Sequence, residues 1–167
     1  MTDREKPVLL VVDECEVRCL LQDIYFSEFG MNVESVNEGA AAVARCSALA
    51  PDVALVSMSL EGELDAVETI RGLKARSGTH IIALADASTS SVDAQVEHAA
   101  RALAAGADML VVKPCMPDTL LRHVKRLLAH RQPDAGRDAA SDDRRSQELG
   151  GEARADGDEA VSLGMSA

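Results

Sequence analysis

The sequence predicts a doubly wound α/β domain that is built on a five-stranded parallel sheet. Four short apolar runs recur along the chain, and a fifth, weaker run alternates apolar with polar residues. Segments with apolar residues at helical spacing separate these runs, and the segments end near glycine or proline residues. Because strands and helices alternate, we expect right-handed crossovers and parallel strands, in the order βαβαβαβαβα.

The predicted strands are short, and four of them are apolar on both faces. Their sequences are VLLVV, VALV, HIIAL and MLVV, at residues 8–12, 53–56, 80–84 and 109–112. Continuous apolar runs of this length are typical of parallel strands that helices cover on both sides. Residues 31–36 alternate after Gly30 and therefore predict an edge strand. With 2% aromatic residues and no Trp, the core must consist mainly of aliphatic side chains.

Five helices are predicted between and after these strands. In the first, apolar residues recur at helical spacing before Gly30, at Val17, Leu20, Leu21 and Ile24. The other four are expected at residues 40–49, 66–76, 92–105 and 118–128. Ser90 lies three residues before Asp93, a spacing that predicts a capped start for the fourth helix.

The predicted domain covers residues 1–131, and the composition changes beyond it. Residues 132–167 are rich in Ala, Gly, Asp and Arg, and they carry nine acidic residues against four Arg. Such a segment buries too little apolar surface to fold by itself. We therefore expect a disordered acidic tail.

The charge and hydropathy of the chain exclude several classes of partner. The formal net charge of −11 would repel nucleic-acid backbones and anionic membranes, so we expect direct binding to neither. No apolar run approaches the roughly 20 residues of a membrane helix. The N-terminal residues MTDREKP are charged where a secretory signal would turn apolar. The sequence therefore predicts a cytoplasmic protein.

Four short segments carry a resemblance to a known family. They are VLLVVDE at residues 8–14, PDVALV before Ser57, AGAD at residues 105–108 and VVKP at residues 111–114. Over residues 7–130 the chain resembles the receiver domain of two-component response regulators, the CheY-like superfamily. The resemblance implies a flavodoxin-like (βα)5 receiver fold, with its site at the carboxyl ends of the strands, where open α/β sheets bind ligands.

The resemblance also implies a site chemistry, which this sequence matches only in part. In the family, an acid pair after the first strand holds Mg²⁺, an Asp that ends the third strand accepts a phosphoryl group, and a Lys after the fifth strand binds its oxygens. By position, Asp13 and Glu14 match the acid pair and Lys113 matches the lysine. The acceptor position holds Ser57, which has no carboxylate to form an acyl phosphate.

Two further positions of the family pattern are changed. Ala85 stands where the family has a Thr or Ser that binds the phosphoryl group, and Leu110 stands where it has an aromatic residue that reports phosphorylation. The phosphoryl acceptor, the hydroxyl that binds the phosphoryl group and the aromatic residue that reports phosphorylation are therefore lost together. We interpret the chain as a pseudo-receiver whose degenerate phosphoacceptor pocket consists of Asp13, Glu14, Ser57, Ala85, Leu110 and Lys113.

Substitutes for the missing aspartate are few. Asp52 lies at the start of the third strand, roughly 16 Å from the site if each residue adds about 3.3 Å. Asp65, in the loop or first helical turn after that strand, is the nearer candidate. The hydroxyl of Ser88 or Thr89 could enter from a lengthened loop and partly replace the group lost at Ala85, without restoring a nucleophile. Ser57 would become a nucleophile only if a base activated it.

Metal and thiol chemistry stay open as hypotheses. Asp13 and Glu14 could hold a divalent ion such as Mg²⁺ weakly, but we favour their pairing with Lys113, because buried charges need partners. Cys15 and Cys115 follow the first and fifth strands and could form a redox switch, although buried reduced thiols are the simpler interpretation. No cofactor is required by the sequence.

The sequence thus predicts a non-enzymatic, stand-alone atypical response regulator that acts through phosphorylation-independent protein–protein interaction. The alternative is a phosphorelay receiver that is still phosphorylated, or that binds metal, through non-standard residues. Expected partners are a signalling kinase, an output protein or a second copy of the chain. The expected partner surface is formed by the fourth helix, fifth strand and fifth helix, with the exposed residues Gln95, Glu97, Arg101 and Arg122.

Overall fold

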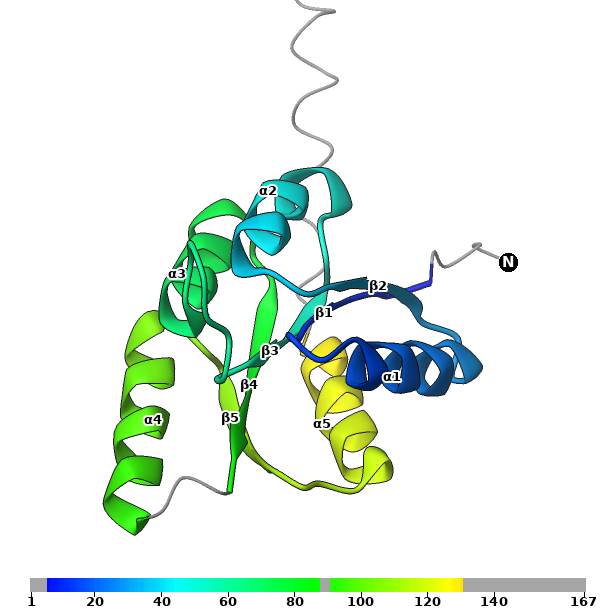
Figure 1. Ribbon diagram of the computed structural model, residues 1–167. Coiled ribbons are helices and arrows are strands. Elements are labelled where there is room, and N and C mark those ends of the chain that lie inside the picture. The colour runs from blue at the N-terminus through cyan, green and yellow to red at the C-terminus, as the bar shows by residue number, and fades with distance from the viewer. Residues whose placement is uncertain (1–5, 88–90, 131–167) are drawn as a thin grey trace, which may run out of the picture. The chain divides into compact units, whose positions relative to one another are not determined.

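A computed structural model describes residues 6–87 and 91–130 of the chain. Five strands and five helices alternate within these ranges (Figure 1). The strands are β1 Val8–Val12, β2 Asn32–Val36, β3 Val53–Ser57, β4 His80–Asp86 and β5 Met109–Lys113. The helices are α1 Glu16–Glu28, α2 Gly39–Leu49, α3 Ala66–Arg76, α4 Val92–Ala105 and α5 Pro117–Ala129. The expected tail at residues 132–167 lies outside the described residues, as do Ser88, Thr89 and Ser90.

The strands form one parallel sheet in the order β2-β1-β3-β4-β5. This arrangement confirms the predicted doubly wound fold, with β2 at an edge as its alternating sequence indicated. The predicted strand 80–84 is two residues too short, because β4 continues through Ala85 to Asp86. In the register of β4 and β5, Asp86 is the partner of Lys113. The extension of β4 therefore brings a carboxylate to the carboxyl edge of the sheet.

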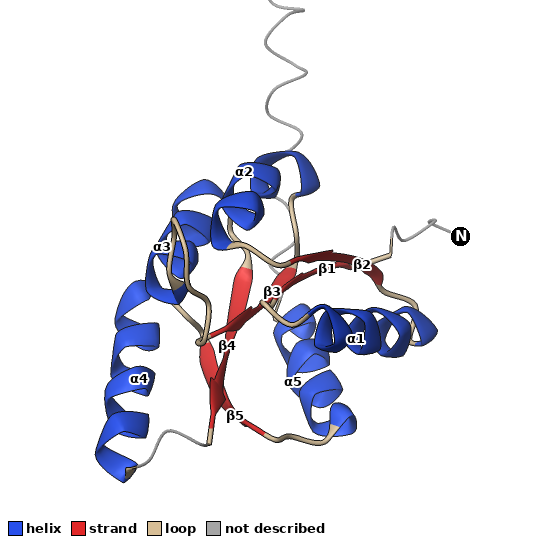
Figure 2. Ribbon diagram, viewed as in Figure 1, coloured by secondary structure: helices blue, strands red, loops and turns tan. Residues whose placement is uncertain are grey.

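Helices cover both faces of the sheet, which explains why the central strands are continuously apolar. Helices α1 and α5 lie on one face, and α2, α3 and α4 lie on the other (Figure 2). The first core contains Phe26, Leu120 and Val124 from its two helices. The second contains Ile70 and Leu73 of α3, together with small residues of α2 and α4. Burial of these side chains supplies the main driving force for folding.

Helix α1 was predicted correctly, but its apolar stripe does not face the core. The stripe residues are all more than half exposed: Val17, Leu20, Leu21 and Ile24. Cys19 and Phe26, on the opposite side of the helix, are the residues buried against the sheet. The helical spacing of apolar residues therefore identified the helix and misidentified the buried face.

Local sequence signals account for two helix starts near the site. Asp65 is the N-cap of α3 and forms a capping box with Glu68, with each side chain bound to the other residue's backbone N–H. Helix α4 begins after Ser91, whose side chain accepts a hydrogen bond from the backbone of Ala94 at 3.2 Å. The cap of α4 is thus Ser91, whereas Ser90, which the sequence paired with Asp93, lies outside the described residues.

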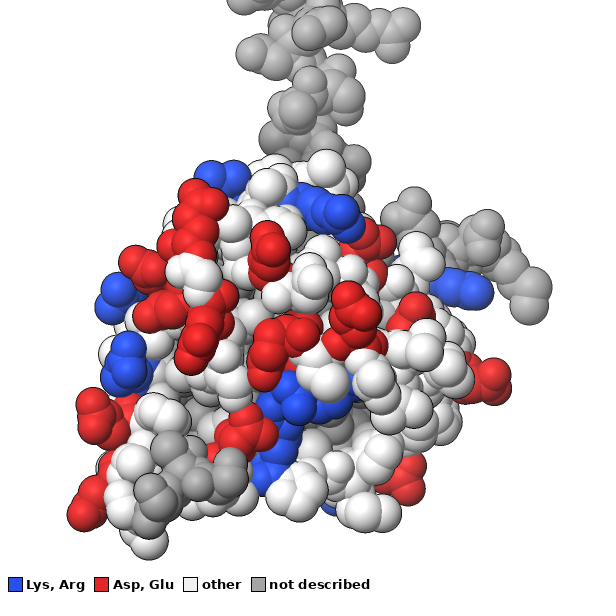
Figure 3. Space-filling model, in the orientation of Figure 1, with Lys and Arg blue, Asp and Glu red and all other residues white. Residues whose placement is uncertain are grey.

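One face of the described residues is mainly acidic. On the face in Figure 3, acidic side chains predominate, and a small group of basic side chains lies among them. Within the described ranges, no helix combines the length and apolar character that a membrane crossing needs. The charge pattern agrees with the net charge of −11 for the whole chain.

Candidate functional site

The carboxyl edge of the sheet gathers charged and polar side chains from four strands. Asp13 directly follows β1, Ser57 ends β3, Asp86 ends β4 and Lys113 ends β5. The sheet is parallel, so all four ends lie at the same edge, where α/β proteins commonly place their sites. Lys113 links them: its Nζ lies 3.3 Å from Ser57 Oγ, 3.3 Å from Asp86 Oδ1 and 4.0 Å from Asp13 Oδ2.

Asp13 is 1% exposed, and its carboxylate is bound chiefly by Arg18 from the first turn of α1. Arg18 Nε donates to both carboxylate oxygens at 2.9 and 3.0 Å, and Nη2 donates to Oδ1 at 2.8 Å. The backbone N–H of Cys15 also donates to Oδ1, at 2.9 Å. These contacts satisfy a buried carboxylate that would otherwise be costly to leave unpaired.

Glu14 is bound by the same arginine. Arg18 Nη2 lies 2.8 Å from Glu14 Oε1, four residues earlier in the chain, and both side chains are partly exposed. The hydrogen bond with Asp13 raises the pKa of the Arg18 guanidinium above its ordinary value, so this cation persists at all physiological pH. The expected pairing of Glu14 with Lys113 is therefore wrong, because Glu14 pairs with Arg18. Asp13 does lie near Lys113, at 4.0 Å, but its contacts with Arg18 are shorter.

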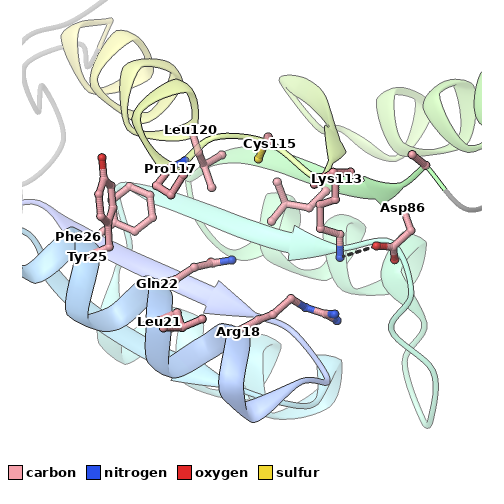
Figure 4. A pocket seen from close by; sticks show the side chains of 13 residues that line it. Arg18, Leu21, Gln22, Tyr25, Phe26, Asp86, Lys113, Cys115, Pro117 and Leu120 are labelled. Atoms are coloured by element: carbon pink, nitrogen blue, oxygen red, sulfur yellow. Dashed lines mark ion pairs between the residues drawn. The ribbon is translucent and has the colours of Figure 1, made fainter.

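Lys113 finds its nearest carboxylate on the neighbouring strand. Its Nζ lies 3.3 Å from Asp86 Oδ1, and the hydroxyl of Ser59 also donates to Asp86. Burial acts to raise the pKa of Asp86, but the hydrogen bond from Ser59 and the charge of Lys113 outweigh it and lower the pKa. Asp86 is therefore ionised at neutral pH and holds Lys113 at the edge of the sheet (Figure 4).

Ser57 is fully buried, and its contacts do not activate it. Lys113 Nζ donates to Ser57 Oγ at 3.3 Å, and the backbone N–H of Ser59 donates to it at 3.4 Å. A nucleophilic serine needs a base that accepts its proton. Both contacts instead place a donor on the oxygen, so Ser57 is held as a hydrogen-bond acceptor.

The other two residues of the expected pocket are apolar side chains of β4 and β5. Ala85 is 2% exposed in β4, and Leu110 is half-buried in β5 against the core under α2, α3 and α4. Asp52 accepts a hydrogen bond from Val8 N at 2.8 Å, at the opposite edge of the sheet. Asp65, the other candidate substitute, is engaged in capping α3.

The acid pair is not arranged to hold Mg²⁺. This ion demands nearly octahedral oxygen ligands, and it is commonly held by carboxylates that face it directly. Here the oxygens of Asp13 and one oxygen of Glu14 face a guanidinium, and the third family ligand is replaced by Ser57. The described residues include no group of three or more His, Cys, Asp or Glu that could hold a metal ion. The contacts thus fit an internal ion pair rather than a metal centre.

Two site residues were missed by sequence reasoning, Arg18 and Asp86. A signal for Arg18 was present, because Glu14 and Arg18 are four residues apart at the start of a predicted helix, where such pairs attract. Asp86 was placed in a loop, because the apolar run of the fourth strand ends at Leu84. Only the strand register shows that Asp86 lies beside Lys113.

The cysteines are free thiols, and two of them flank the site. Cys15 and Cys115 are partly buried, whereas Cys19 and Cys46 are buried. Burial raises the pKa of the Cys115 thiol, which lowers its thiolate fraction at neutral pH. The redox hypothesis for Cys15 and Cys115 stays a prediction.

The residues of the expected partner surface lie on helices α4 and α5. Arg101 lies on the side of α4 toward α3, and its Nη2 is 4.0 Å from Asp65 Oδ2. Gln95 is half-buried and donates to the carbonyl of Ala87 at 3.5 Å. Glu97 is exposed on α4, and Arg122 is exposed on α5.

Comparisons with known proteins agree with this architecture. Residues 8–125 match the family model described as the response regulator receiver domain. The signal receiver domain of a modulated diguanylate cyclase from Desulfovibrio desulfuricans G20 is 29% identical, with a TM-score of 0.65 over 75% of this chain and 95% of that chain. No curated protein matches the chain.

Two further solved structures share the fold at lower identity. A CheY-like receiver domain protein from Methanospirillum hungatei JF-1 is 23% identical, with a TM-score of 0.66, 75% of this chain covered and 95% of that chain. NtrX from Brucella abortus, solved in complex with ADP, is 21% identical, with a TM-score of 0.66, 75% of this chain covered and 27% of that chain.

Proposed function

Because this chain belongs to the response regulator receiver family, we propose that it is a pseudo-receiver that signals through phosphorylation-independent protein–protein interaction. The proposal rests on the contacts of Ser57, the residue at the acceptor position. Ser57 is fully buried there and accepts a hydrogen bond from Lys113, while Arg18 binds both members of the acid pair. A pocket that neutralises its own charges needs no phosphoryl group or metal ion to keep its shape.

A second candidate function rests on Asp86. This carboxylate lies 3.3 Å from Lys113, one strand away from the acceptor position, and it is ionised at neutral pH. Phosphoryl transfer to Asp86 would preserve a phosphorelay role through a non-standard residue. The ion pair of Asp86 with Lys113 and the contact from Ser59 argue against it, since they occupy the oxygens that would attack phosphorus.

Incubation of the full chain with acetyl phosphate and millimolar Mg²⁺ is expected to leave its intact mass unchanged. The physical reasons are that Ser57 has no carboxylate to form an acyl phosphate, and that its hydroxyl contacts two donors and no base that would activate it to form a phosphate ester. Intact mass spectrometry checks the result. The matched control is Asp86→Asn, which removes the carboxylate that lies 3.3 Å from Lys113 Nζ.

A gain of one phosphoryl group that hydroxylamine removes would contradict the pseudo-receiver proposal. If that gain also disappeared in Asp86→Asn, the phosphorelay alternative would replace it. Ser57→Asp by itself is expected to restore at most weak metal binding, because Ala85 and Leu110 remain unable to sense a phosphoryl group.

Helix α4 and strand β5 offer the best surface for a protein partner. Apolar side chains recur at helical spacing on α4 and are each more than half exposed: Val92, Val96 and Leu103. Val112 on β5 is also exposed. Exposed apolar stripes of this kind commonly mark interaction sites. Because this surface depends on no phosphoryl group, it is permanently available.

Replacing the apolar side chains of α4 is expected to weaken partner binding without unfolding the domain. In Val96→Asp/Leu103→Asp, retention of a partner purified from the native cell should fall about tenfold, while the unfolding free energy changes by about 0.5 kcal/mol or less. Quantitative pull-down and thermal melting measure the two effects. Arg101→Glu/Arg122→Glu is the comparison, and it tests the surface that the sequence indicated.

A comparison of partner binding by the two double variants shows which surface contacts the partner. Loss of binding in the charge-reversal variant alone would move the partner surface to the residues expected from the sequence. Unchanged binding in both folded variants would remove α4 from the interface. Sedimentation of the purified chain distinguishes a second copy from a different protein, because only self-association depends on the concentration of this chain.

A further inference from the structure

Helix α1 carries an apolar stripe on the side that faces away from the sheet. Its four residues are each more than half exposed: Val17, Leu20, Leu21 and Ile24. The opposite side of the helix, with Cys19 and Phe26, packs on the sheet. Large apolar side chains that are exposed together commonly mark a surface that another molecule covers.

The spacing within the stripe favours a second helix of the same sequence. Val17 and Ile24 are seven residues apart, and Leu20 lies between them, three residues after Val17. These are the a, d and a positions of a heptad. β-branched residues at a with Leu at d favour two parallel helices. So short a pattern would not pair two free helices, but α1 is already held in place by its sheet.

The charges on this face of the domain have opposite signs on its two helices. Helix α1 carries three acidic side chains that are at least partly exposed: Glu16, Asp23 and Glu28. Helix α5, on the same face of the sheet (Figure 2), carries three exposed basic side chains: Arg122, Lys125 and Arg126. Lys125 Nζ lies 5.3 Å from the centre of the Phe29 ring, just beyond α1. The basic cluster therefore borders the surface of α1.

The order of these features across the surface follows from the contacts of α1. Tyr25, one residue after Ile24, donates a hydrogen bond to Asp118 of α5. Asp23, one residue before Ile24, therefore lies on the other side of the stripe, away from α5, because each residue turns the helix by 100°. The same holds for Glu16, seven residues earlier. The surface thus runs from an acidic edge, across the apolar stripe, to the basic helix.

We propose that a second copy of this chain covers the stripe, with α1 packed along α1 of the other copy. A two-fold axis parallel to the helices places the acidic edge of each copy against the basic helix of the other. A foreign helix with charges of one sign would satisfy only one of the two edges. This interface lies outside the α4 surface and does not depend on the pseudo-receiver proposal.

Sedimentation of the purified full chain tests the proposal. We expect a reversible monomer–dimer equilibrium within roughly 1 µM to 1 mM, because the net charge of −11 on each copy opposes tighter association. Leu20→Gln/Ile24→Gln should weaken the dimer about tenfold or more. Its melting temperature should stay nearly unchanged, since both side chains are exposed and Gln is a good helix former.

Two charge-reversal variants test the identity of the occupant. Glu16→Lys/Asp23→Lys makes both edges basic, and Arg122→Glu/Lys125→Glu makes both acidic, so each variant by itself should dimerise about tenfold more weakly. An equimolar mixture of the two should restore dimers, because unlike edges then meet. Native mass spectrometry identifies these mixed dimers by mass.

The matched control for net charge is Glu61→Lys/Glu63→Lys. It changes the charge of the chain as much as Glu16→Lys/Asp23→Lys does, but both residues are exposed in the loop after β3. Self-association of this control should not weaken.

A natural chain that stays monomeric over the whole concentration range would overturn the proposal. Dimers that persist undiminished in folded Leu20→Gln/Ile24→Gln would place self-association on another surface and overturn it too. If the two charge-reversal variants dimerise no better together than apart, the opposed edges do not meet and the parallel arrangement is wrong. A melting curve of each variant establishes that it is folded.

Discussion

Arg18→Ala is expected to lower the free energy of unfolding by about 2 kcal/mol. Removing one partner of a fully buried ion pair costs about 3–5 kcal/mol. The smaller value follows because Arg18 is 38% exposed and Lys113 Nζ remains 4.0 Å from Asp13. Chemical denaturation measures the change. The control is Arg45→Ala, which removes an exposed ion pair with Glu34 and should cost about 0.5 kcal/mol.

The same substitution is expected to create a response to metal. Without the guanidinium, Glu14 loses its cation and Asp13 keeps only Lys113 at 4.0 Å, so a divalent ion that binds the two carboxylates stabilises the folded state. Millimolar Mg²⁺ should therefore raise the melting temperature of Arg18→Ala and leave that of the natural chain unchanged. Equal stabilisation of both proteins would show that Arg18 does not block the acid pair.

Phe26→Ala is expected to cost about 3–4 kcal/mol of unfolding free energy, the largest loss for a single change in α1. Phe26 is 1% exposed and packs with Leu120 and Val124 between α1, α5 and the sheet. The other buried residues of this core are mainly aliphatic, so loss of the ring leaves a cavity. Urea denaturation with a fitted slope measures the loss and tests whether unfolding stays two-state.

Phe29→Ala serves as the matched control, because Phe29 is 47% exposed just beyond the same helix. Its ring contacts Tyr25 and lies 5.3 Å below Lys125 Nζ, so its loss should cost about 1 kcal/mol or less. Equal losses for the two variants would contradict the assignment of Phe26 to the core of this face.

The pattern of apolar residues was enough to predict the number, order and type of the elements. Buried parallel strands must be apolar on both faces, so the runs at residues 8–12 and 53–56 were recognisable without any tertiary information. The parallel sheet then follows from the alternation of strands and helices. The resemblance to receiver domains placed Asp13, Ser57 and Lys113 at one edge of that sheet, and the structure brings them together there.

The sequence did not determine which side of a helix is buried. Apolar residues in α1 and α4 recur at helical spacing, yet in both helices the stripe faces outward. A period of 3.6 residues shows that a helix is amphipathic, but it does not tell whether its own sheet or another molecule covers the apolar side. Contacts between α1 and the sheet use Cys19 and Phe26 instead.

The pairing of charges at the site depends on the packing of the whole sheet. Arg18 binds Asp13 because the first turn of α1 returns across the end of β1, and Asp86 meets Lys113 because β4 and β5 are in that register. Many cations and carboxylates in this acidic chain could pair, and sequence spacing ranks only neighbours on one helix. Contacts between residues 27 or 56 positions apart depend on strand order and register, which arise only when the whole sheet packs.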